Sequence, residues 1–257
     1  MYDPASPLLR SAVSDDGPPA AGAKGRFAED RLLDAVIWCE IVPGETVTEA
    51  DVMARFGLTR AAARAGLTRL GYDGWAMPQP RTGWRVLSVT GALIGHVLDA
   101  RRAAESALIH VDPSAEARAE LAQIDRVLAS LETRSEAGAV GTVRHYVDRV
   151  DGILLAAMNP FTARHLRKLW HHSARITHFL EDAATGRLFH RRDTRALIAA
   201  VAARDLDAIA AARTALIAAQ ETFFLQQLLR SDAPLTPGSG AKRLERIQDT
   251  TPNRRDA

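Results

Sequence analysis

The 257-residue sequence predicts a mainly α-helical protein made of a small mixed domain and a larger all-helical one. Glycine and proline divide residues 26–88 into short elements, whereas residues 89–231 are poor in both and rich in alanine, leucine and arginine. Residues 1–25 and 232–257 lack hydrophobic periodicity, so we expect two disordered tails. Apolar residues make up 47% of the chain and charged residues 25%, which is the composition of a globular protein.

The small domain is expected to begin with a helix over residues 27–42, where apolar residues recur at helical spacing. The chain then turns at Pro43-Gly44. Thr48 stands three residues before Asp51, an N-cap arrangement with an acidic third position, and it predicts the start of a second helix. Gly57 is a typical helix stop.

A third helix follows after a turn of only two or three residues, with Thr59 as its N-cap. Two short helices joined by such a tight turn are typical of a helix-turn-helix. Residues 75–89 alternate on both sides of Arg81-Thr82-Gly83, which predicts a two-stranded hairpin with a glycine tip. The small domain is therefore predicted to be a winged helix-turn-helix of three helices and a β-hairpin.

Positive charge is concentrated in the third helix and the hairpin. Between positions 60 and 85 five arginines and one aspartate give a net charge of +4, against +2 for the whole chain: Arg60, Arg64, Arg69, Asp73, Arg81 and Arg85. Arg60 and Arg64 share a helix face near the helix N-terminus, which favours phosphate, and arginine can also bond guanine bidentately. An isolated arginine pair is usually a solvated surface, but the turn spacing and hairpin favour DNA binding.

The larger domain is predicted to be a bundle of about six helices. Its helices are expected at residues 90–110, from 114 to about 131, from the Gly141 region to Asn159, from Pro160 to Gly186, at 193–203 and at 205–231. No strand pattern occurs in this half of the sequence.

Several classes of protein are excluded by composition. No run approaches 18 consecutive apolar residues, so we expect no membrane span. The first 25 residues lack the apolar block of a secretory signal. The single cysteine, Cys39, cannot form an internal disulfide or a thiolate zinc cluster. These features favour a cytoplasmic protein.

Residues 43–86 resemble the DNA-binding domain of the GntR family of bacterial transcription regulators. The positions that match its pattern are Pro43-Gly44, Thr48-Glu49, Leu58-Thr59-Arg60, Arg64, Gly66-Leu67, Leu70, Asp73-Gly74 and Gly83. The sequence departs at Ala62-Ala63, where the family has Pro-Val, and at Ala65-Gly66, where the family has Glu-Ala. The resemblance implies that Thr59, Arg60 and Arg64 contact DNA and that Gly83 approaches a phosphate.

Residues 90–231 are similar to the FadR C-terminal (FCD) type of effector domain. The matching segments are 99–105, 156–160 and 193–205. The resemblance implies an antiparallel bundle of six to seven helices, a homodimer that binds a palindromic operator, and a small-molecule effector. Regulators of this kind are most often repressors.

Many FCD domains hold a divalent metal through an Asp-x3-His pair and two later histidines. Alignment places these ligands at positions that carry no suitable donor set: Tyr146, Val150, Thr194 and about Leu216. We therefore expect no metal cofactor. A register slip onto Asp148 or Asp151 would restore one ligand only, and an unusual site from His171, Arg175 and His178 is the alternative.

A bundle that accepts a small organic acid needs a buried cation. Arg101 is the first candidate, because it lies among apolar stripe positions; the alternative is an interhelical or surface ion pair with Glu105. Weaker effector-binding candidates are Arg144, Arg167, His171 and Arg175. Without the metal, three alternatives remain open. The ligand is an acid bound by these side chains, the ligand is a more apolar molecule, or the domain has lost ligand binding.

Two other functions were weighed against a DNA-binding regulator. An enzyme is not indicated, because the sequence has no nucleophile elbow, phosphate-binding glycine loop or spaced carboxylate pair. A helical adaptor that uses the winged helix for protein contacts is the remaining alternative, and the salt dependence of DNA binding discriminates between the two.

Overall fold

The computed structural model describes residues 21–131, 137–181, 187–191 and 194–230. They form two compact units, which are considered separately. The first contains residues 21–34 and 46–85, and the second contains residues 35–45 and those from 86 onward. The segments 1–20 and 231–257, which hold most of the predicted tails, lie outside the described residues.

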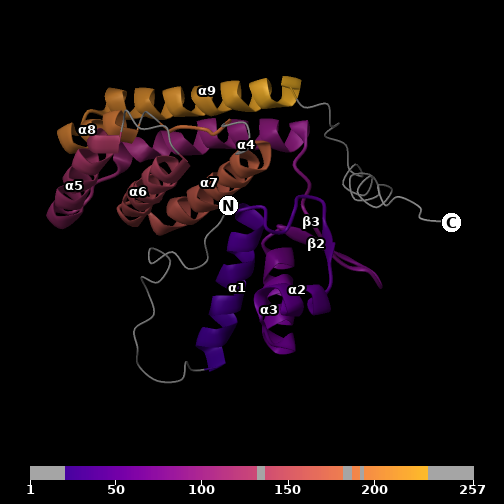
Figure 1. Ribbon diagram of the computed structural model, residues 1–257. Coiled ribbons are helices and arrows are strands. Elements are labelled where there is room, and N and C mark those ends of the chain that lie inside the picture. Colours follow the sequence, from indigo (N-terminus) through magenta and orange to yellow (C-terminus); the bar gives the residue numbers. More distant parts are fainter. Residues whose placement is uncertain (1–20, 132–136, 182–186, 192–193, 231–257) are drawn as a thin grey trace, which may run out of the picture. The chain divides into compact units, whose positions relative to one another are not determined.

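The first unit has three helices and a small antiparallel sheet of strand order β1-β3-β2 (Figure 1). Its elements are α1 (Ala21–Ile37, whose last three residues belong to the second unit), β1 (Thr46–Val47), α2 (Glu49–Phe56), α3 (Arg60–Tyr72), β2 (Ala76–Gln79) and β3 (Gly83–Val86). The predicted fold class is confirmed. Helix α1 begins earlier than predicted, at Ala21, and so includes five residues of the segment expected to be disordered.

Local capping explains why the second and third helices start where they do. Thr48 Oγ1 accepts from the Asp51 backbone N–H at 3.2 Å, and the Asp51 carboxylate accepts from the Thr48 backbone N–H at 2.8 Å. This is the predicted capping arrangement. Gly57 ends α2 in the left-handed conformation, with φ of 64°. Thr59 then caps α3, and its hydroxyl accepts from the Ala62 N–H.

The core of the first unit joins α1, α2 and α3. Leu32, Val52, Leu67 and Trp75 are buried in it. Gly66 is also buried, and a Cβ there would come within 2.6 Å of Leu32 Cδ1. Glycine at this departure from the GntR pattern thus allows α3 to pack closely on α1.

The wing differs in one detail from its prediction. Residue Arg81, with φ of 67°, lies in the turn, and Gly83, with φ of 117°, is the first residue of β3. A Cβ on Gly83 would come within 2.4 Å of the Val47 carbonyl oxygen on β1. Packing within the sheet therefore requires this glycine, and the tip is formed by the preceding residues.

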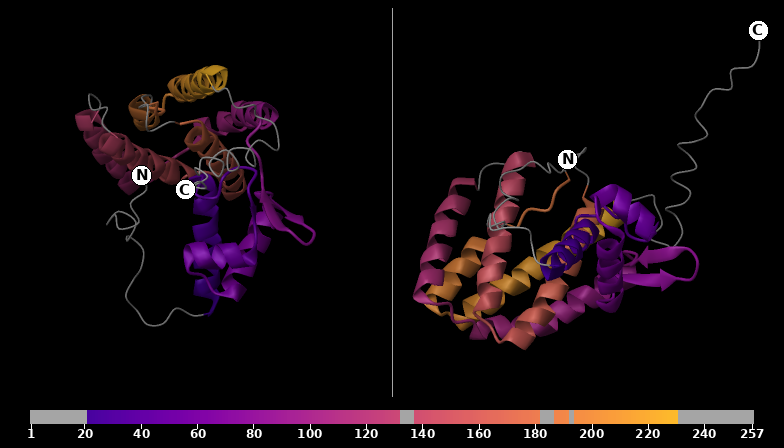
Figure 2. Two further views of the ribbon diagram at one scale, coloured as in Figure 1. Left: turned by 45° about the vertical axis from the view of Figure 1, so that its right-hand side comes forward. Right: turned by 90° about the horizontal axis from the view of Figure 1, so that it is seen from below.

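The second unit is a helical bundle. Its elements are α4 (Gly91–Ala104), the 3-10 helix η2 (Glu105–His110), α5 (Ala115–Leu131), α6 (Ala137–Ala156), α7 (Pro160–Leu180), α8 (Thr194–Ala203) and α9 (Leu206–Arg230). Helices α5 and α6 lie side by side, and α4 packs against α7 (Figures 1 and 2). The predicted helix over 90–110 is thus divided at Glu105, and α7 ends before Gly186, because Glu181 is extended.

Two apolar clusters stabilise the bundle. One centres on Leu121, Leu154 and Leu166, and the other on Leu98, Ile176 and Phe224. Asn159 caps α7 with Pro160 in its first turn, as the sequence predicts.

Helix α9 has the length and mean hydropathy, 1.2 over 18 residues, of a membrane-crossing helix. Core helices pass the same test, and α9 packs against α4, α7 and α8. It also buries Arg213, Gln220 and Gln227, which hydrocarbon would not accommodate without polar partners. Its composition is therefore explained by its place in the bundle.

Candidate nucleic-acid interface and buried polar cluster

The start of α3 presents two exposed arginines, Arg60 and Arg64. Arg60 is the first helical residue, directly after the N-cap Thr59. At this end of a helix the free N–H groups and the partial positive charge favour an anion. Neither arginine is packed inward, so both can reach a ligand outside the first unit.

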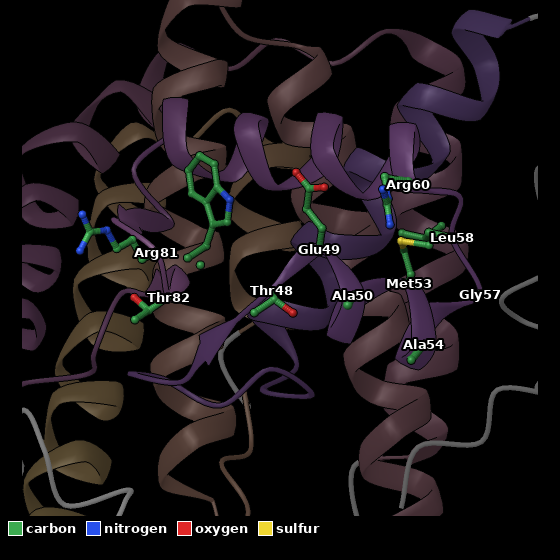
Figure 3. Close-up of a pocket in the computed structure, with 12 residues that line it drawn as sticks. Thr48, Glu49, Ala50, Met53, Ala54, Gly57, Leu58, Arg60, Arg81 and Thr82 are labelled. Atoms are coloured by element: carbon green, nitrogen blue, oxygen red, sulfur yellow. The ribbon is translucent and has the colours of Figure 1, made fainter.

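An open hollow of about 810 Å³ lies between α2, the start of α3 and the wing (Figure 3). Its lining residues are Thr48, Glu49, Ala50, Met53, Ala54, Gly57, Leu58, Arg60, Arg81, Thr82, Gly83 and Trp84. Figure 3 shows Arg60 and Arg81 at opposite sides of the hollow, with Glu49 between them. The hollow thus joins a helix N-terminus to the wing, and cations lie at both edges.

Arg64 is held by Glu49 in a two-point contact. Its Nε donates to Glu49 Oε1 at 2.7 Å, and its Nη2 donates to Oε2 at 3.1 Å. The side chain of Arg64 is nevertheless 67% exposed. The hydrogen bond from Arg64 lowers the pKa of Glu49, so the carboxylate is ionised at neutral pH.

Arg69 is separated from this group. It lies in the last turn of α3, where its Nε donates to Asp73 at 2.7 Å, and it does not line the hollow. Of the predicted DNA-contacting residues, the structure therefore brings Arg60, Arg81 and Gly83 to one hollow. Arg64 does not line the hollow, but it bonds Glu49, which does. Thr59 is the N-cap of α3.

In the bundle, Arg101 belongs to a buried polar cluster formed by Arg101, Glu105, Trp170, Ser173, Arg213 and Gln220. Glu105 Oε1 accepts from Arg101 Nε at 2.5 Å and from Trp170 Nε1 at 2.8 Å, while Oε2 accepts from Arg213 Nε at 2.7 Å. Arg101 also donates to Ser173 and Gln220. The predicted ion pair with Glu105 is present, and it lies in the core.

Glu105 is the centre of this cluster. Burial alone would raise its pKa, but the charges of Arg213 and Arg101 outweigh burial and the pKa is lowered. Burial, opposed by Glu105, lowers the pKa of Arg101. One carboxylate therefore faces two guanidinium groups.

A second carboxylate extends the cluster. Asp151 accepts from Arg191 Nη1 and Nη2 at 2.7 and 3.2 Å, and Arg213 Nη1 lies 3.8 Å from Asp151 Oδ1. Three guanidinium groups thus face the carboxylates of Glu105 and Asp151. Close by, burial and the neighbouring Asp151 raise the pKa of Asp148 to about 6.

The other predicted effector residues are dispersed. Arg144 on α6 pairs with Glu181, and Arg167 is exposed on α7. Burial lowers the pKa of His171 to about 4, so its imidazole is neutral. None of these three contacts the buried polar cluster through a hydrogen bond among those of the described residues.

Arg175 on α7 is 1% exposed and lacks a carboxylate partner among the described residues. It donates through Nη2 to the Leu87 carbonyl, while Nε and Nη1 have no hydrogen-bond partner. Burial lowers its pKa to about 10, with a smaller opposing effect of Cys39. Burial also raises the pKa of the Cys39 thiol to about 11, so that group supplies no negative charge at neutral pH.

The metal ligands implied by the FCD resemblance do not fit these residues. Val150, Thr194 and Leu216 are buried, and only Thr194 offers an oxygen. In the described part of the chain no group of three His, Cys, Asp or Glu side chains could hold a metal ion. The absence of a metal cofactor stays a prediction.

Sequence reasoning missed Arg213 and Arg191, and it considered Asp151 only as a possible metal ligand. A signal for Arg213 exists, because Arg213, Gln220 and Gln227 interrupt an otherwise apolar helix at intervals of seven residues and all are buried. Such spacing places polar groups on one face of a helix. Glu49 was noted only as part of a helix start, and nothing local links it to Arg64.

Neither a family model nor a curated protein matches the sequence. Among solved structures, E. coli McbR/YncC is similar with a TM-score of 0.62 and 14% identity, over 80% of this chain and 98% of that one. A putative transcriptional regulator GntR from Rhodococcus sp. RHA1 has a TM-score of 0.58 and 21% identity, over 79% of this chain and 98% of that one. The chain shares their fold. This agrees with a winged helix-turn-helix followed by a helical domain.

Proposed function

We propose that the chain is a DNA-binding transcription regulator of the GntR family, in the FadR-like group with an FCD-type effector domain. The observation that carries the proposal is the hollow that joins the N-terminus of α3 to the wing, with Arg60 and Arg81 at its edges and Arg64 beside it. The fold shared with a structure described as a GntR transcriptional regulator supports it.

In this proposal α3 enters the major groove and the wing contacts the backbone. Arg60 and the first N–H groups of α3 bind a phosphate, and Arg64 contacts bases. The protein acts in the cytoplasm as a homodimer, because a two-fold symmetric pair of winged helices matches a palindromic operator. It acts as a repressor and performs no enzymatic reaction.

The effector is proposed to be a small organic acid that binds at the buried polar cluster. The guanidinium groups of Arg101, Arg191 and Arg213 are the cations of this region that a carboxylate would bind. Because only differential binding shifts a conformational equilibrium, such a ligand would alter DNA affinity by a coupling free energy of about 1–3 kcal/mol.

Arg64→Ala tests the DNA interface. A bidentate arginine–base contact is worth about 1–3 kcal/mol, so affinity for a duplex selected by the wild-type protein should fall roughly 10- to 100-fold. Arg126→Ala, an exposed arginine on α5, is the control and should leave affinity unchanged. Fluorescence anisotropy over a range of salt concentrations measures both.

Wild-type affinity should also fall steeply as salt rises, because phosphate contacts release counterions. Equal affinity of Arg64→Ala and wild type would contradict the placement of α3. No DNA binding even at low salt, together with binding to a protein partner, would favour the helical adaptor.

A further inference from the structure

The contact between Arg64 and Glu49 leaves one edge of the guanidinium group available. Arg64 uses Nε and Nη2 for the two Glu49 oxygens, at 2.7 and 3.1 Å. The remaining donors, both N–H groups of Nη1 and the second of Nη2, form the end of the fork. This end is the planar pair of donors that matches guanine O6 and N7.

Glu49 lies at a fixed position in the fold. It is the first residue of α2, directly after the N-cap Thr48, and Asp51 closes the capping box. Because Asp51 satisfies the N-cap, the Glu49 carboxylate remains free to reach Arg64 on α3, and its side chain is only 30% exposed. The less exposed side chain of Glu49 therefore holds the more exposed one of Arg64.

We propose that Glu49 is a specificity-determining residue. Glu49 holds Arg64 so that the free edge of the Arg64 guanidinium group bonds a guanine, and the neighbouring carboxylate makes this group less attracted to phosphates. The proposal rests on the proposed DNA-binding function. A guanidinium group beside a carboxylate carries little net charge, so non-specific attraction to the DNA backbone is weakened. Its two-point contact also limits rotation of the side chain, so less entropy is lost when Arg64 meets the base.

Two substitutions separate charge from position. Glu49→Gln removes the negative charge and one acceptor, so Arg64 is released and the domain gains one positive charge. Glu49→Asp keeps the charge but shortens the side chain, so the two-point contact is lost. Asp73→Asn is the matched control, because Asp73 pairs with Arg69 on the same helix, away from the hollow.

The experiment selects duplexes from a random-sequence pool with wild-type protein and each variant. Wild type should enrich a guanine that Arg64→Ala no longer prefers. Glu49→Gln should keep DNA binding, lose about tenfold in preference for that guanine, and show a salt slope steeper by about one per domain. Glu49→Asp should lose a similar preference without the steeper slope, and Asp73→Asn should keep the preference.

The outcomes distinguish the two proposals. If wild type enriches a guanine that Glu49→Gln and Glu49→Asp prefer equally, the role of Glu49 is wrong and DNA binding stands. An equal loss of preference in Asp73→Asn would assign the effect to net charge and also overturn the role of Glu49. If wild type enriches no duplex, the DNA-binding function itself is overturned. Melting temperatures equal to wild type confirm that the variants fold.

Discussion

The arginines of the first unit and those of the bundle differ in how their donors are used. Arg64 is 67% exposed and bonds one carboxylate, which leaves an edge of its guanidinium free. Arg101 has a side chain only 2% exposed, and it bonds Glu105, Ser173 and Gln220. Arg64 therefore keeps donors for a partner, whereas Arg101 bonds other side chains of the bundle.

This difference determines what each group contributes to stability. An exposed ion pair adds little, because water screens the charges and both side chains lose freedom. A buried pair is expensive to form, but removal of one member leaves an uncompensated charge in the core. Changes to α3 should therefore alter binding with little effect on stability, and changes to the buried polar cluster should do the reverse.

Glu105→Gln is expected to give the largest effect on stability. The substitution leaves Arg101 and Arg213 without their shared carboxylate in a buried site, which should cost about 3–5 kcal/mol of unfolding free energy. Urea unfolding measures the loss. Glu49→Gln removes the corresponding carboxylate of the exposed pair and should unfold at the urea concentration of wild type. Equal unfolding free energies of Glu105→Gln and wild type would show that other groups balance the charges of Arg101 and Arg213 when the carboxylate is absent.

A decrease in pH should lower the unfolding free energy of the bundle more than that of the first unit. Burial lowers the pKa of His171, His172 and His178 on α7 to about 4, whereas residues 26–88 contain no histidine. A lowered histidine pKa means that the unfolded chain binds the proton more tightly than the folded one. These histidines therefore leave stability unchanged above pH 6.5 and lower it as pH decreases from 6.5 to about 4. Protonation of Asp148, whose pKa is raised to about 6, opposes part of this loss.

His172 alone should account for roughly 3 kcal/mol of this loss, from the difference between its folded and unfolded pKa. Urea unfolding at several pH values between 7 and 4 gives the slope. In His172→Gln the slope should be shallower, whatever its stability at pH 7. His96→Gln, at an exposed position of α4, should keep the wild-type slope, and an unchanged slope in His172→Gln would contradict the neutral buried state.

Some of these features could be predicted from the sequence and others could not. The caps at Thr48 and Thr59 and the stop at Gly57 are encoded within a few residues, so the helix-turn-helix could be predicted. The partners of charged groups that lie far apart in the sequence could not be predicted. Glu49 and Arg64 are 15 positions apart, and Glu105 and Arg213 are 108 apart, and only the packing of different helices brings them together.

The burial of Arg101 was predicted because it interrupts an apolar stripe, and its spacing indicated Glu105 as a partner, but not Ser173 or Gln220. Gly83 gives a further example of this limit. Its place between alternating residues predicted a turn, whereas the close approach of the Val47 carbonyl depends on β1, which lies more than thirty residues earlier in the chain. Local signals thus define the elements, and tertiary contacts define the site.

Arg175→Met tests the same difference within the bundle, because Arg175 and Arg101 are both almost fully buried and, among the described residues, Arg101 alone of the two has a carboxylate partner. The lowered pKa of Arg175 corresponds to a cost of roughly 3 kcal/mol for its charged form in the folded state. The lost hydrogen bond to the Leu87 carbonyl offsets part of it, by about 1–3 kcal/mol. The net expectation is a gain in stability of about 1 kcal/mol in urea unfolding, whereas Arg101→Met should destabilise. A loss in Arg175→Met as large as that in Arg101→Met would mean that an anion compensates Arg175 in the folded protein.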